Sequence, residues 1–167
     1  RLHIDTWRWA GVPIFVRAGK RLPITATEVI VRLKQPPLAI FDESTVALAN
    51  YFRFRLSPEV VIATGTRVKR PGDAMAGQWT ELTARHAIDD SNLPYGRLLR
   101  DALHGDPALF TQDESVEAAW RVVQPMLNSD AAPIEYASGT WGPSDTTALI
   151  EDGNAWHNPV PEVSPLC

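Results

Sequence analysis

The sequence has little cysteine and no long apolar run. Its single cysteine, Cys167, is the last of 167 residues, so an internal disulfide and a zinc site built on cysteines are excluded. No apolar stretch reaches the roughly 18 residues of a membrane-spanning helix, and the N-terminus has no signal-peptide core. We therefore expect a soluble, cytoplasmic protein that does not bind membranes.

The chain also lacks an excess of basic residues. Its 16 lysines and arginines stand against 20 acidic residues, which gives a formal net charge of -4. A general nucleic-acid binder usually carries a strong positive charge, so that class is excluded and any anion site must be local. Hydrophobic content of 44% and charged content of 22% are ordinary for one globular domain, here expected over residues 1–167.

Motifs that carry catalysis are missing from the chain. It contains neither a Gly-x-Ser-x-Gly elbow nor a Gly-x-Gly-x-x-Gly fingerprint. The pair Gly19-Lys20 does not make a phosphate-binding P-loop, because Ile14 and Arg21 occupy the places of its first glycine and its Ser or Thr. The histidines, which lack zinc-type spacing, are His3, His86, His104 and His157. We nominate no catalytic residue and expect no metal site.

Alternating apolar and polar residues predict a series of strands. The predicted strands are, in order, residues 2–6, 12–16, 27–34, 46–56, 60–64 and 78–83. The turn signal Ser57-Pro58-Glu59 joins the fourth and fifth as a hairpin. Arginines alternate with phenylalanines in 46–56, which predicts a sheet with one polar, solvated face and one apolar face.

Helical periodicity follows the strands. It predicts a helix over 94–105 that ends at Gly105, and a second helix that starts in a capping box of Thr111 and Glu114 and ends or kinks at Pro125. A short helix over 144–152 and an extended last ten residues complete the chain. Strands before helices predict an α+β fold, with a large, mostly antiparallel sheet and helices packed on one face.

The stretch Arg17-Ala18-Gly19-Lys20-Arg21-Leu22-Pro23 is a candidate anion site. Cationic groups emerge there where an apolar segment reaches a loop, and the glycine lets the backbone turn freely before the lysine. A phosphate or acidic-sugar contact by Lys20 is the functional interpretation. A strand end with solvated charges fits the same residues, and spacing alone favours it.

Two further features have a functional and a structural interpretation. Arg53 and Arg55 can hold an anion, but a solvated sheet face accounts better for them. The tryptophans Trp120, Trp141 and Trp156 can stack on a ligand, but packing in a core or at an interface is favoured for each.

An ordered set of short motifs resembles the C-terminal domain of glucose-6-phosphate dehydrogenase over almost the whole chain. These motifs are Arg8-Trp9-Ala10-Gly11-Val12-Pro13, Arg17-Ala18-Gly19-Lys20-Arg21-Leu22, Glu28-Val29, Ser57-Pro58-Glu59, Lys69-Arg70-Pro71-Gly72, Tyr95-Gly96-Arg97-Leu98-Leu99, Ala119-Trp120-Arg121, Tyr136 with Gly139 to Pro143, and Trp156-His157-Asn158-Pro159. Each is weak alone, but their shared order is specific. The resemblance implies oxidation of glucose 6-phosphate with NADP in the pentose phosphate pathway.

The resemblance also implies what lies elsewhere. Family members carry a nucleotide-binding Rossmann domain and an Asp-His-Tyr-Leu-Gly-Lys motif with the catalytic histidine before this region, and neither occurs in this chain. We therefore expect a fragment of a longer enzyme that is inactive alone and forms a homodimer or homotetramer through its sheet. The alternative is a stand-alone assembly or regulatory module that lost the substrate site.

Substrate contacts follow from the resemblance position by position. Lys20 matches the lysine that contacts glucose 6-phosphate. The chain has Thr25 where the family has a second basic residue, and Ser57 where it has a glutamine. Both differences predict altered substrate recognition.

Some family members hold a second, structural NADP in this domain. Arg17, Arg55 and Trp156 match positions of that site. The positions where the better-known site uses other gripping residues hold Ala26, Ile30, Ala63, Gly65 and Trp141. We therefore expect NADP to be bound mainly by the Rossmann domain and the structural nucleotide to be absent.

Overall fold

The computed structural model describes most of the chain. The described residues are 1–35, 37–38, 40–41, 49–72, 75–86, 94–150 and 155–161. The beginning of the strand predicted over 46–56, the end of the helix predicted over 144–152 with Gly153, and residues 162–167 of the predicted extended tail lie outside them.

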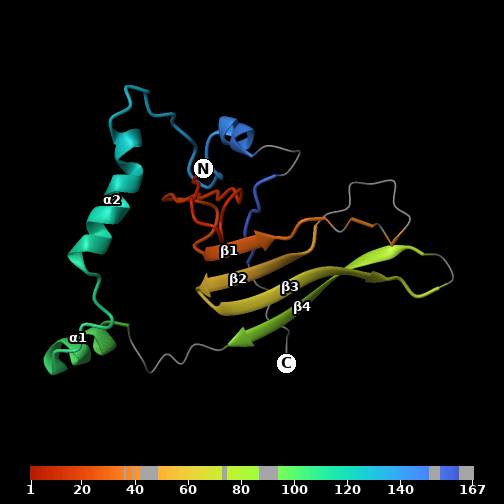
Figure 1. Cartoon of the computed structure of the whole chain (residues 1–167), viewed down its shortest axis with the longest axis horizontal. Coiled ribbons are helices and arrows are strands. Elements are labelled where there is room, and N and C mark those ends of the chain that lie inside the picture. Colours follow the sequence, from red (N-terminus) through yellow and green to blue (C-terminus); the bar gives the residue numbers. More distant parts are fainter. Residues whose placement is uncertain are drawn as a thin grey trace. The chain divides into compact units, whose positions relative to one another are not determined.

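Within the described residues, four strands form one antiparallel sheet (Figure 1). They are β1 (Thr27–Arg32), β2 (Tyr51–Ser57), β3 (Val60–Lys69) and β4 (Gly77–His86). Their order in the sheet is their order in the chain, so each strand is hydrogen-bonded to its sequence neighbour. The strands expected over 27–34, 60–64 and 78–83 are confirmed, as are the described part of 46–56 and the hairpin turn after Ser57.

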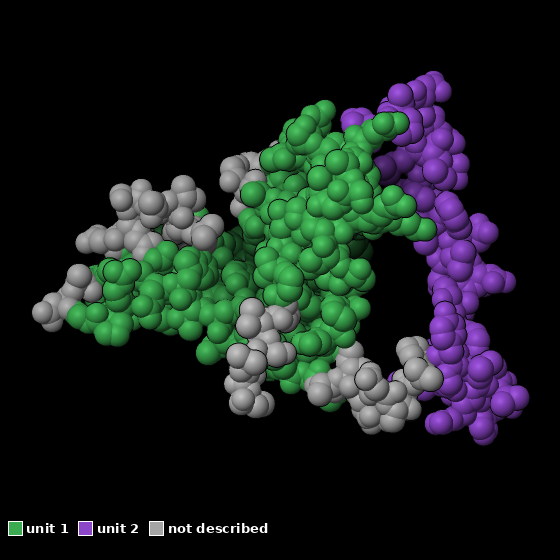
Figure 2. All heavy atoms as spheres, turned by 180° about the vertical axis from the view of Figure 1, so that it is seen from behind, with its two compact units in different colours: residues 1–87, 135–167 green, residues 88–134 purple. Residues whose placement is uncertain are grey.

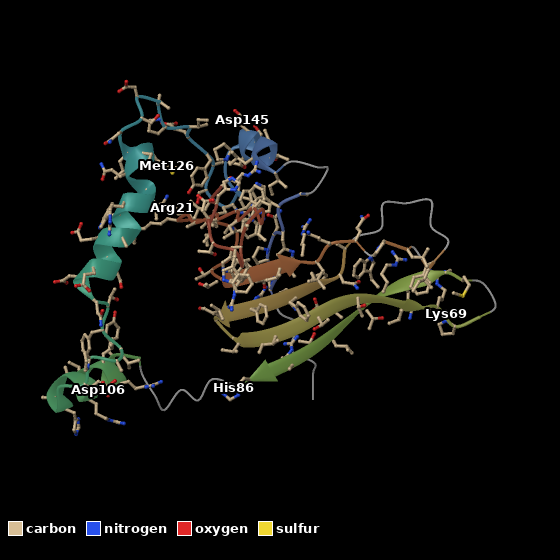
Figure 3. All side chains as sticks on the ribbon, viewed as in Figure 1. Arg21, Lys69, His86, Asp106, Met126 and Asp145 are labelled. Carbon is tan, nitrogen blue, oxygen red and sulfur yellow. The ribbon has the colours of Figure 1, made fainter. Side chains whose placement is uncertain are left out.

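Strands β3 and β4 are longer than the predicted segments 60–64 and 78–83. Their register pairs Val60 with His86 at one end and Lys69 with Gly77 at the other. Figure 3 accordingly shows Lys69 and His86 at opposite ends of this hairpin. The β3–β4 hairpin therefore continues beyond the end of the β2–β3 pairing, which stops at Gly65 opposite Tyr51.

The two strands predicted near the N-terminus are not formed. Residues 2–6 and 12–16 share only an isolated antiparallel bridge, in which the backbones of Leu2 and Ile14 exchange hydrogen bonds of 2.7 and 3.1 Å. Turns occupy residues 7–11 between the two segments, and Gly11 has a φ of 74°. The two segments thus enclose a turn closed by one bridge and do not form a pair of strands.

The faces of β2 are inverted relative to the prediction. The period of two is correct, but Arg53 and Arg55 are buried at 7% and 3% exposure, whereas Leu56 on the opposite face is 56% exposed. The core of the described chain lies beside the arginines, on Val61 and Ala63 of β3. The expected solvated arginine face is therefore wrong, because the arginines are buried in ion pairs described below.

Among the described residues, two α-helices follow the strands in the chain. They are α1 (Pro94–His104) and α2 (Asp113–Leu127), and a 3₁₀ helix, η1 (Ser144–Leu149), follows. The predicted end at Gly105 is confirmed, since this glycine has a φ of 70° and the next N–H bonds back to Asp101 O. None of the helices in the described part is long and apolar enough to cross a membrane.

The start of α2 differs from the prediction. Gln112 is the N-cap residue, and within described residues 94–150 no side chain caps this end, so the capping box of Thr111 and Glu114 is not formed. The acidic residues Asp113 and Glu114 lie in the first turn, where the helix dipole favours negative charge. The helix also continues through Pro125 to Leu127 instead of ending there.

The chain divides into two compact units, coloured separately in Figure 2. Unit 1 contains Arg1–Ala87 and Glu135–Cys167, with the sheet and η1; unit 2 is Ile88–Ile134, with α1 and α2. An α+β fold with an antiparallel sheet is confirmed. The packing of helices on one face of the sheet stays a prediction. Trp120 of α2 is 56% exposed, so its packing at an interface also stays a prediction.

Candidate functional site

The basic loop around Lys20 is exposed, and its backbone is held by a distant segment. Lys20 itself is exposed, and Arg21, labelled in Figure 3, has a φ of 55°. The hydroxyl of Tyr136 donates to the Lys20 carbonyl at 2.9 Å, and the N–H of Gly139 donates to the Arg21 carbonyl at 2.8 Å. The loop therefore presents a lysine from a fixed main chain.

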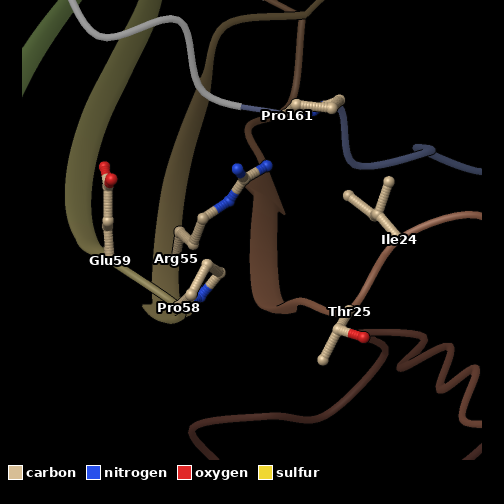
Figure 4. Close-up of a pocket in the computed structure, with 6 residues that line it drawn as sticks. All are labelled: Ile24, Thr25, Arg55, Pro58, Glu59 and Pro161. Atoms are coloured by element: carbon tan, nitrogen blue, oxygen red, sulfur yellow. The ribbon is translucent and has the colours of Figure 1, made fainter.

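The other two predicted substrate residues, Thr25 and Ser57, lie at one end of the β1–β2 pair. Both are exposed, and the register places Thr27 opposite Ser57. A shallow cavity of about 240 Å³ lies at this end, shown in Figure 4. It is lined by Ile24, Thr25, Arg55, Pro58, Glu59 and Pro161. The structure thus brings Thr25 and the Ser57–Pro58 turn together, while Lys20 does not line this cavity.

Glu28 of β1 is the centre of a buried ion-pair cluster. Its side chain is 2% exposed, and its Oε2 accepts from Arg55 Nε at 2.8 Å and from Arg53 Nη1 at 3.3 Å. Its Oε1 lies 2.6 Å from Nε2 of His157 in the C-terminal tail. One carboxylate therefore joins two strands and the tail. Glu28 lies across from Arg55 in the register of β1 and β2, and this pairing of a carboxylate with an arginine is the sequence signal for its role.

A second carboxylate, Glu81 of β4, binds the other side of Arg53. It accepts from Arg53 Nη2 at 2.6 Å and from the hydroxyl of Tyr51 at 2.6 Å. Burial alone would raise the pKa of Glu81, but the hydrogen bonds from Arg53 and Tyr51 outweigh it and lower that pKa below its ordinary value. Burial, followed by the bond to Glu81, raises the pKa of Tyr51 to about 12.

The guanidinium of Arg17 is held between two tryptophan rings. Its Cζ lies 4.5 Å from the ring centroid of Trp141 and 4.9 Å from that of Trp156, within the range of cation–π attraction. Its Nη2 donates to the carbonyl of His157 at 3.1 Å and to Oδ1 of Asn158 at 2.7 Å. Burial lowers the pKa of Arg17 from its ordinary value. Trp141 and Trp156 were predicted to pack in a core or at an interface, and in the structure both pack on the Arg17 guanidinium.

Arginines fix the tail, residues 155–161, through its backbone. Arg32 donates to the carbonyl of Ala155 at 3.0 Å, and Arg55 donates to that of Val160 at 2.8 Å. Together with the bond from Arg17 to the His157 carbonyl, these contacts hold the tail beside β1, where Figure 1 shows it in dark blue. The tail is thus held both through its main-chain oxygens and through the side chains of Trp156, His157 and Asn158.

The three residues matched to a structural NADP are engaged by the protein itself. Arg17 is stacked and bonded to the tail, Arg55 binds Glu28 and Val160, and Trp156 has one ring face on Arg17 and donates from Nε1 to the carbonyl of Thr146 at 2.9 Å. At Gly65, a Cβ would lie 2.2 Å from atoms of the Tyr51 ring, so no larger side chain fits without displacing that ring. All three residues matched to the structural nucleotide thus have partners within the described part of the chain.

The fold and the basic loop together define a class of domain. Among the described residues, the sheet is an antiparallel meander, which is not the doubly wound parallel arrangement of a dinucleotide-binding fold. What the chain presents is an α+β domain with a cationic loop at its surface.

Comparison with known proteins names the family. A family model of the glucose-6-phosphate dehydrogenase C-terminal domain matches residues 1–157. Glucose-6-phosphate 1-dehydrogenase of Aggregatibacter actinomycetemcomitans is 37% identical over 166 residues, which are 95% of this chain and 33% of that protein. That of Mycobacterium tuberculosis is 38% identical over 164 residues, 95% of this chain and 34% of that protein.

Solved structures agree with this match. The crystal structure of glucose-6-phosphate 1-dehydrogenase from Mycobacterium avium superimposes with a TM-score of 0.81 at 34% identity, covering 96% of this chain and 35% of that one. A glucose-6-phosphate dehydrogenase in complex with its substrate glucose 6-phosphate gives a TM-score of 0.71 at 27% identity, covering 93% and 34%.

The chain belongs to the glucose-6-phosphate dehydrogenase family, in which it corresponds to the C-terminal domain. It spans about a third of the length of the relatives it matches.

Proposed function

We propose that this chain is the C-terminal, substrate-side domain of a glucose-6-phosphate dehydrogenase. The complete enzyme oxidises glucose 6-phosphate to 6-phosphogluconolactone and reduces NADP, as the first step of the pentose phosphate pathway. The family match over residues 1–157 is the observation that carries the proposal. On this proposal, residues 1–167 form one functional domain, although the chain divides into two compact units.

Lys20 supplies the contact to the substrate phosphate. An ammonium group that meets a phosphate oxygen makes a charge-assisted hydrogen bond worth roughly 1.5 to 3 kcal/mol. The loop geometry supports this role, because the lysine side chain is exposed while the carbonyls of Lys20 and Arg21 are bonded to residues 136–139. Thr25 and Ser57 contribute hydroxyls where the family uses a cation and an amide, so Lys20 provides the positive charge at this side of the sugar.

The chemical step belongs to residues outside this chain. Hydride leaves C1 of the sugar for NADP while a histidine base takes the proton from the C1 hydroxyl, and the Asp-His-Tyr-Leu-Gly-Lys motif with that histidine does not occur here. This domain binds and orients the substrate at its remote phosphate end. We expect the isolated domain to be inactive.

NADP is bound at the catalytic site of the complete enzyme, mainly by its Rossmann domain. We propose that no structural NADP binds to this domain. The contacts of Arg17, Arg55 and Trp156 support this, since each already binds other parts of the chain. In this chain the tail itself occupies the arginines that a structural nucleotide would use.

We further propose a homodimer or homotetramer that forms through the sheet and acts in the cytoplasm. The sheet face opposite the arginines supports the first part of this proposal. Leu56, Ile62 and Leu82 on that face are 56%, 50% and 66% exposed, so it has apolar area left to cover.

A non-catalytic assembly or regulatory module derived from this domain is the alternative. Thr25 and Ser57 favour it, because they replace two residues with which the family binds substrate. The gene sequence upstream of Arg1 separates the two proposals. A Gly-rich strand-turn-helix and an Asp-His-Tyr motif there would support the enzyme, and a start codon close to Arg1 would support the module.

A rate assay of the purified gene product tests the function directly. Reduction of NADP, or of NAD, is followed by absorbance with and without glucose 6-phosphate, and glucose serves as the control substrate that lacks the phosphate. We expect reduction that depends on glucose 6-phosphate. Absence of reduction with either nucleotide would refute the enzyme proposal.

A further inference from the structure

We infer that Tyr136 is a positioning residue for the substrate phosphate, acting through the main chain of Lys20. The inference rests on the proposed function, since it assumes that Lys20 contacts glucose 6-phosphate. Tyr136 lies 116 positions further along the chain, just before the turn that ends in Gly139. Its hydroxyl therefore connects the C-terminal segment of unit 1 to the basic loop around Lys20.

Two consecutive carbonyls of the loop are bonded by this one segment. Tyr136 Oη donates to the Lys20 carbonyl at 2.9 Å, and the Gly139 N–H donates to the Arg21 carbonyl at 2.8 Å. Gly139 can make the second bond because its turn has a φ of 80°, which a glycine adopts without strain. The bonds hold the two peptide units that flank the Cα of Arg21.

The backbone at this link requires such support. Arg21 has a φ of 55°, in the left-handed region that residues other than glycine, asparagine and aspartate seldom occupy. A residue keeps such a conformation only where its surroundings fix it. The contacts from Tyr136 and Gly139 fix this one, and they thereby set the direction in which the preceding Lys20 side chain leaves the loop.

The glycine before the lysine fits the same arrangement. A Cβ on Gly19 would lie 3.3 Å from Tyr136 Oη and 3.4 Å from Leu22 Cδ2, which is a tight approach. The tyrosine hydroxyl thus comes close to the backbone at Gly19 as well as bonding to Lys20. This explains the glycine in the Arg17–Pro23 stretch by the position of Tyr136.

Loss of this hydroxyl affects binding of the substrate more than it affects the fold. Tyr136 is 41% exposed, so removing its oxygen leaves the ring in place and opens no buried cavity. The loop then samples other conformations, and the apparent affinity falls in proportion to the fraction that still places Lys20 correctly. Since the phosphate lies far from C1, the turnover rate at saturating sugar is unaffected.

The test is Tyr136→Phe in the full-length gene product. We expect the dissociation constant and KM for glucose 6-phosphate to rise about 2- to 10-fold, the range of one neutral hydrogen bond, with kcat and the KM for NADP unchanged. Tyr95→Phe is the matched control, because Tyr95 is 78% exposed on α1. It should leave all four constants at their wild-type values.

A double-mutant cycle with Lys20→Ala shows whether Tyr136 acts through the lysine. If it does, Tyr136→Phe adds no further loss of affinity in the Lys20→Ala background. Independent, multiplicative losses would overturn the inference, and so would wild-type affinity in Tyr136→Phe while Lys20→Ala binds weakly. If Lys20→Ala binds glucose 6-phosphate as tightly as wild type, or wild type does not bind it, the proposed function fails first.

Discussion

Glu28 shows how a single carboxylate determines which face of the sheet is buried. Its carboxylate is paired with Arg53 and Arg55 of β2 and contacts His157 of the tail, and its side chain is only 2% exposed. Arg53 also has Glu81 on its far side. Two buried guanidinium groups are stable here because carboxylates face both of them.

Neutralising this carboxylate should therefore destabilise the domain strongly. We expect Glu28→Gln to lower the free energy of unfolding by about 3 to 5 kcal/mol, because the charges of Arg53 and Arg55 stay buried after their shared partner is lost. Urea denaturation of the gene product measures the change. Glu59→Gln is the control: Glu59 is 52% exposed, its nearest Arg85 nitrogen is 3.9 Å away, and its loss should change stability by less than about 1 kcal/mol. Equal effects of the two substitutions would contradict the role given to Glu28.

At the scale of the elements, β2 and β4 are joined across β3 by the contacts of Glu81. Tyr51 and Arg53 of β2 both donate to this carboxylate of β4. They reach it across Gly65 of β3, which pairs with Tyr51 on one side and with Glu81 on the other. The glycine leaves the space that the tyrosine ring fills. From the sequence, Gly65 is notable only as one of the positions that differ from the family's structural NADP site.

The lowered pKa of Glu81 makes this link sensitive to acid. Because its folded-state pKa lies below the unfolded value, its contribution to stability is complete above that unfolded value, about 4.3, and disappears as the pH falls through the folded-state pKa. The stability difference between wild type and Glu81→Gln should thus be largest near neutral pH and shrink below roughly pH 4.

Urea denaturation over that pH range measures the difference. Thr83→Ala is a suitable control, because it removes only a bond of 3.4 Å to Glu81 and keeps the carboxylate with its stronger partners. This variant should follow the pH dependence of wild type. A difference between wild type and Glu81→Gln that stays constant down to the acid end would contradict the account.

The sequence predicted the positions of most elements but not which face of the sheet is buried. The strands confirmed as β1 to β4 alternate and carry β-branched or aromatic residues, so their local pattern was sufficient. The burial of Arg53 was not predictable, because its partners Glu28 and Glu81 lie 25 and 28 residues away. The capping box was wrong for a local reason. The N-cap residue is Gln112, one position after Thr111, so Thr111 and Glu114 do not occupy the N-cap and N3 positions that a capping box requires.

In the candidate site, the loop was predictable from the sequence but its support by a distant residue was not. The motif around Lys20 identified the loop, and the structure shows that lysine exposed. Its support by Tyr136 depends on a contact across 116 residues, which no spacing rule reveals. The roles of Lys20, Thr25 and Ser57 in substrate binding stay predictions.

At the scale of the whole molecule, the tail contacts the residues that the resemblance assigns to a structural nucleotide. Arg17 and Arg55 hold its carbonyls, and Trp156 of the tail covers the Arg17 guanidinium. A cofactor that binds only the folded state stabilises it by mass action, whereas a tail that belongs to the chain needs no free ligand.

The tail contacts predict the stoichiometry of NADP. We expect equilibrium dialysis of the gene product to find one NADP per subunit, bound at the catalytic site. Arg17→Ala should leave that number unchanged while it lowers the thermal unfolding temperature. Two NADP molecules per subunit, one of them lost in Arg17→Ala, would show that the domain holds a structural nucleotide after all.

The proposed function depends on the binding of the substrate phosphate by Lys20. The most direct test compares the KM for glucose 6-phosphate of the wild-type gene product, Lys20→Ala and Lys34→Ala, where Lys34 is another exposed lysine. Loss of a charge-assisted hydrogen bond predicts a rise of roughly 10- to 100-fold for Lys20→Ala alone, with the KM for NADP unchanged. A sugar KM in Lys20→Ala equal to that of Lys34→Ala and wild type would contradict the claim.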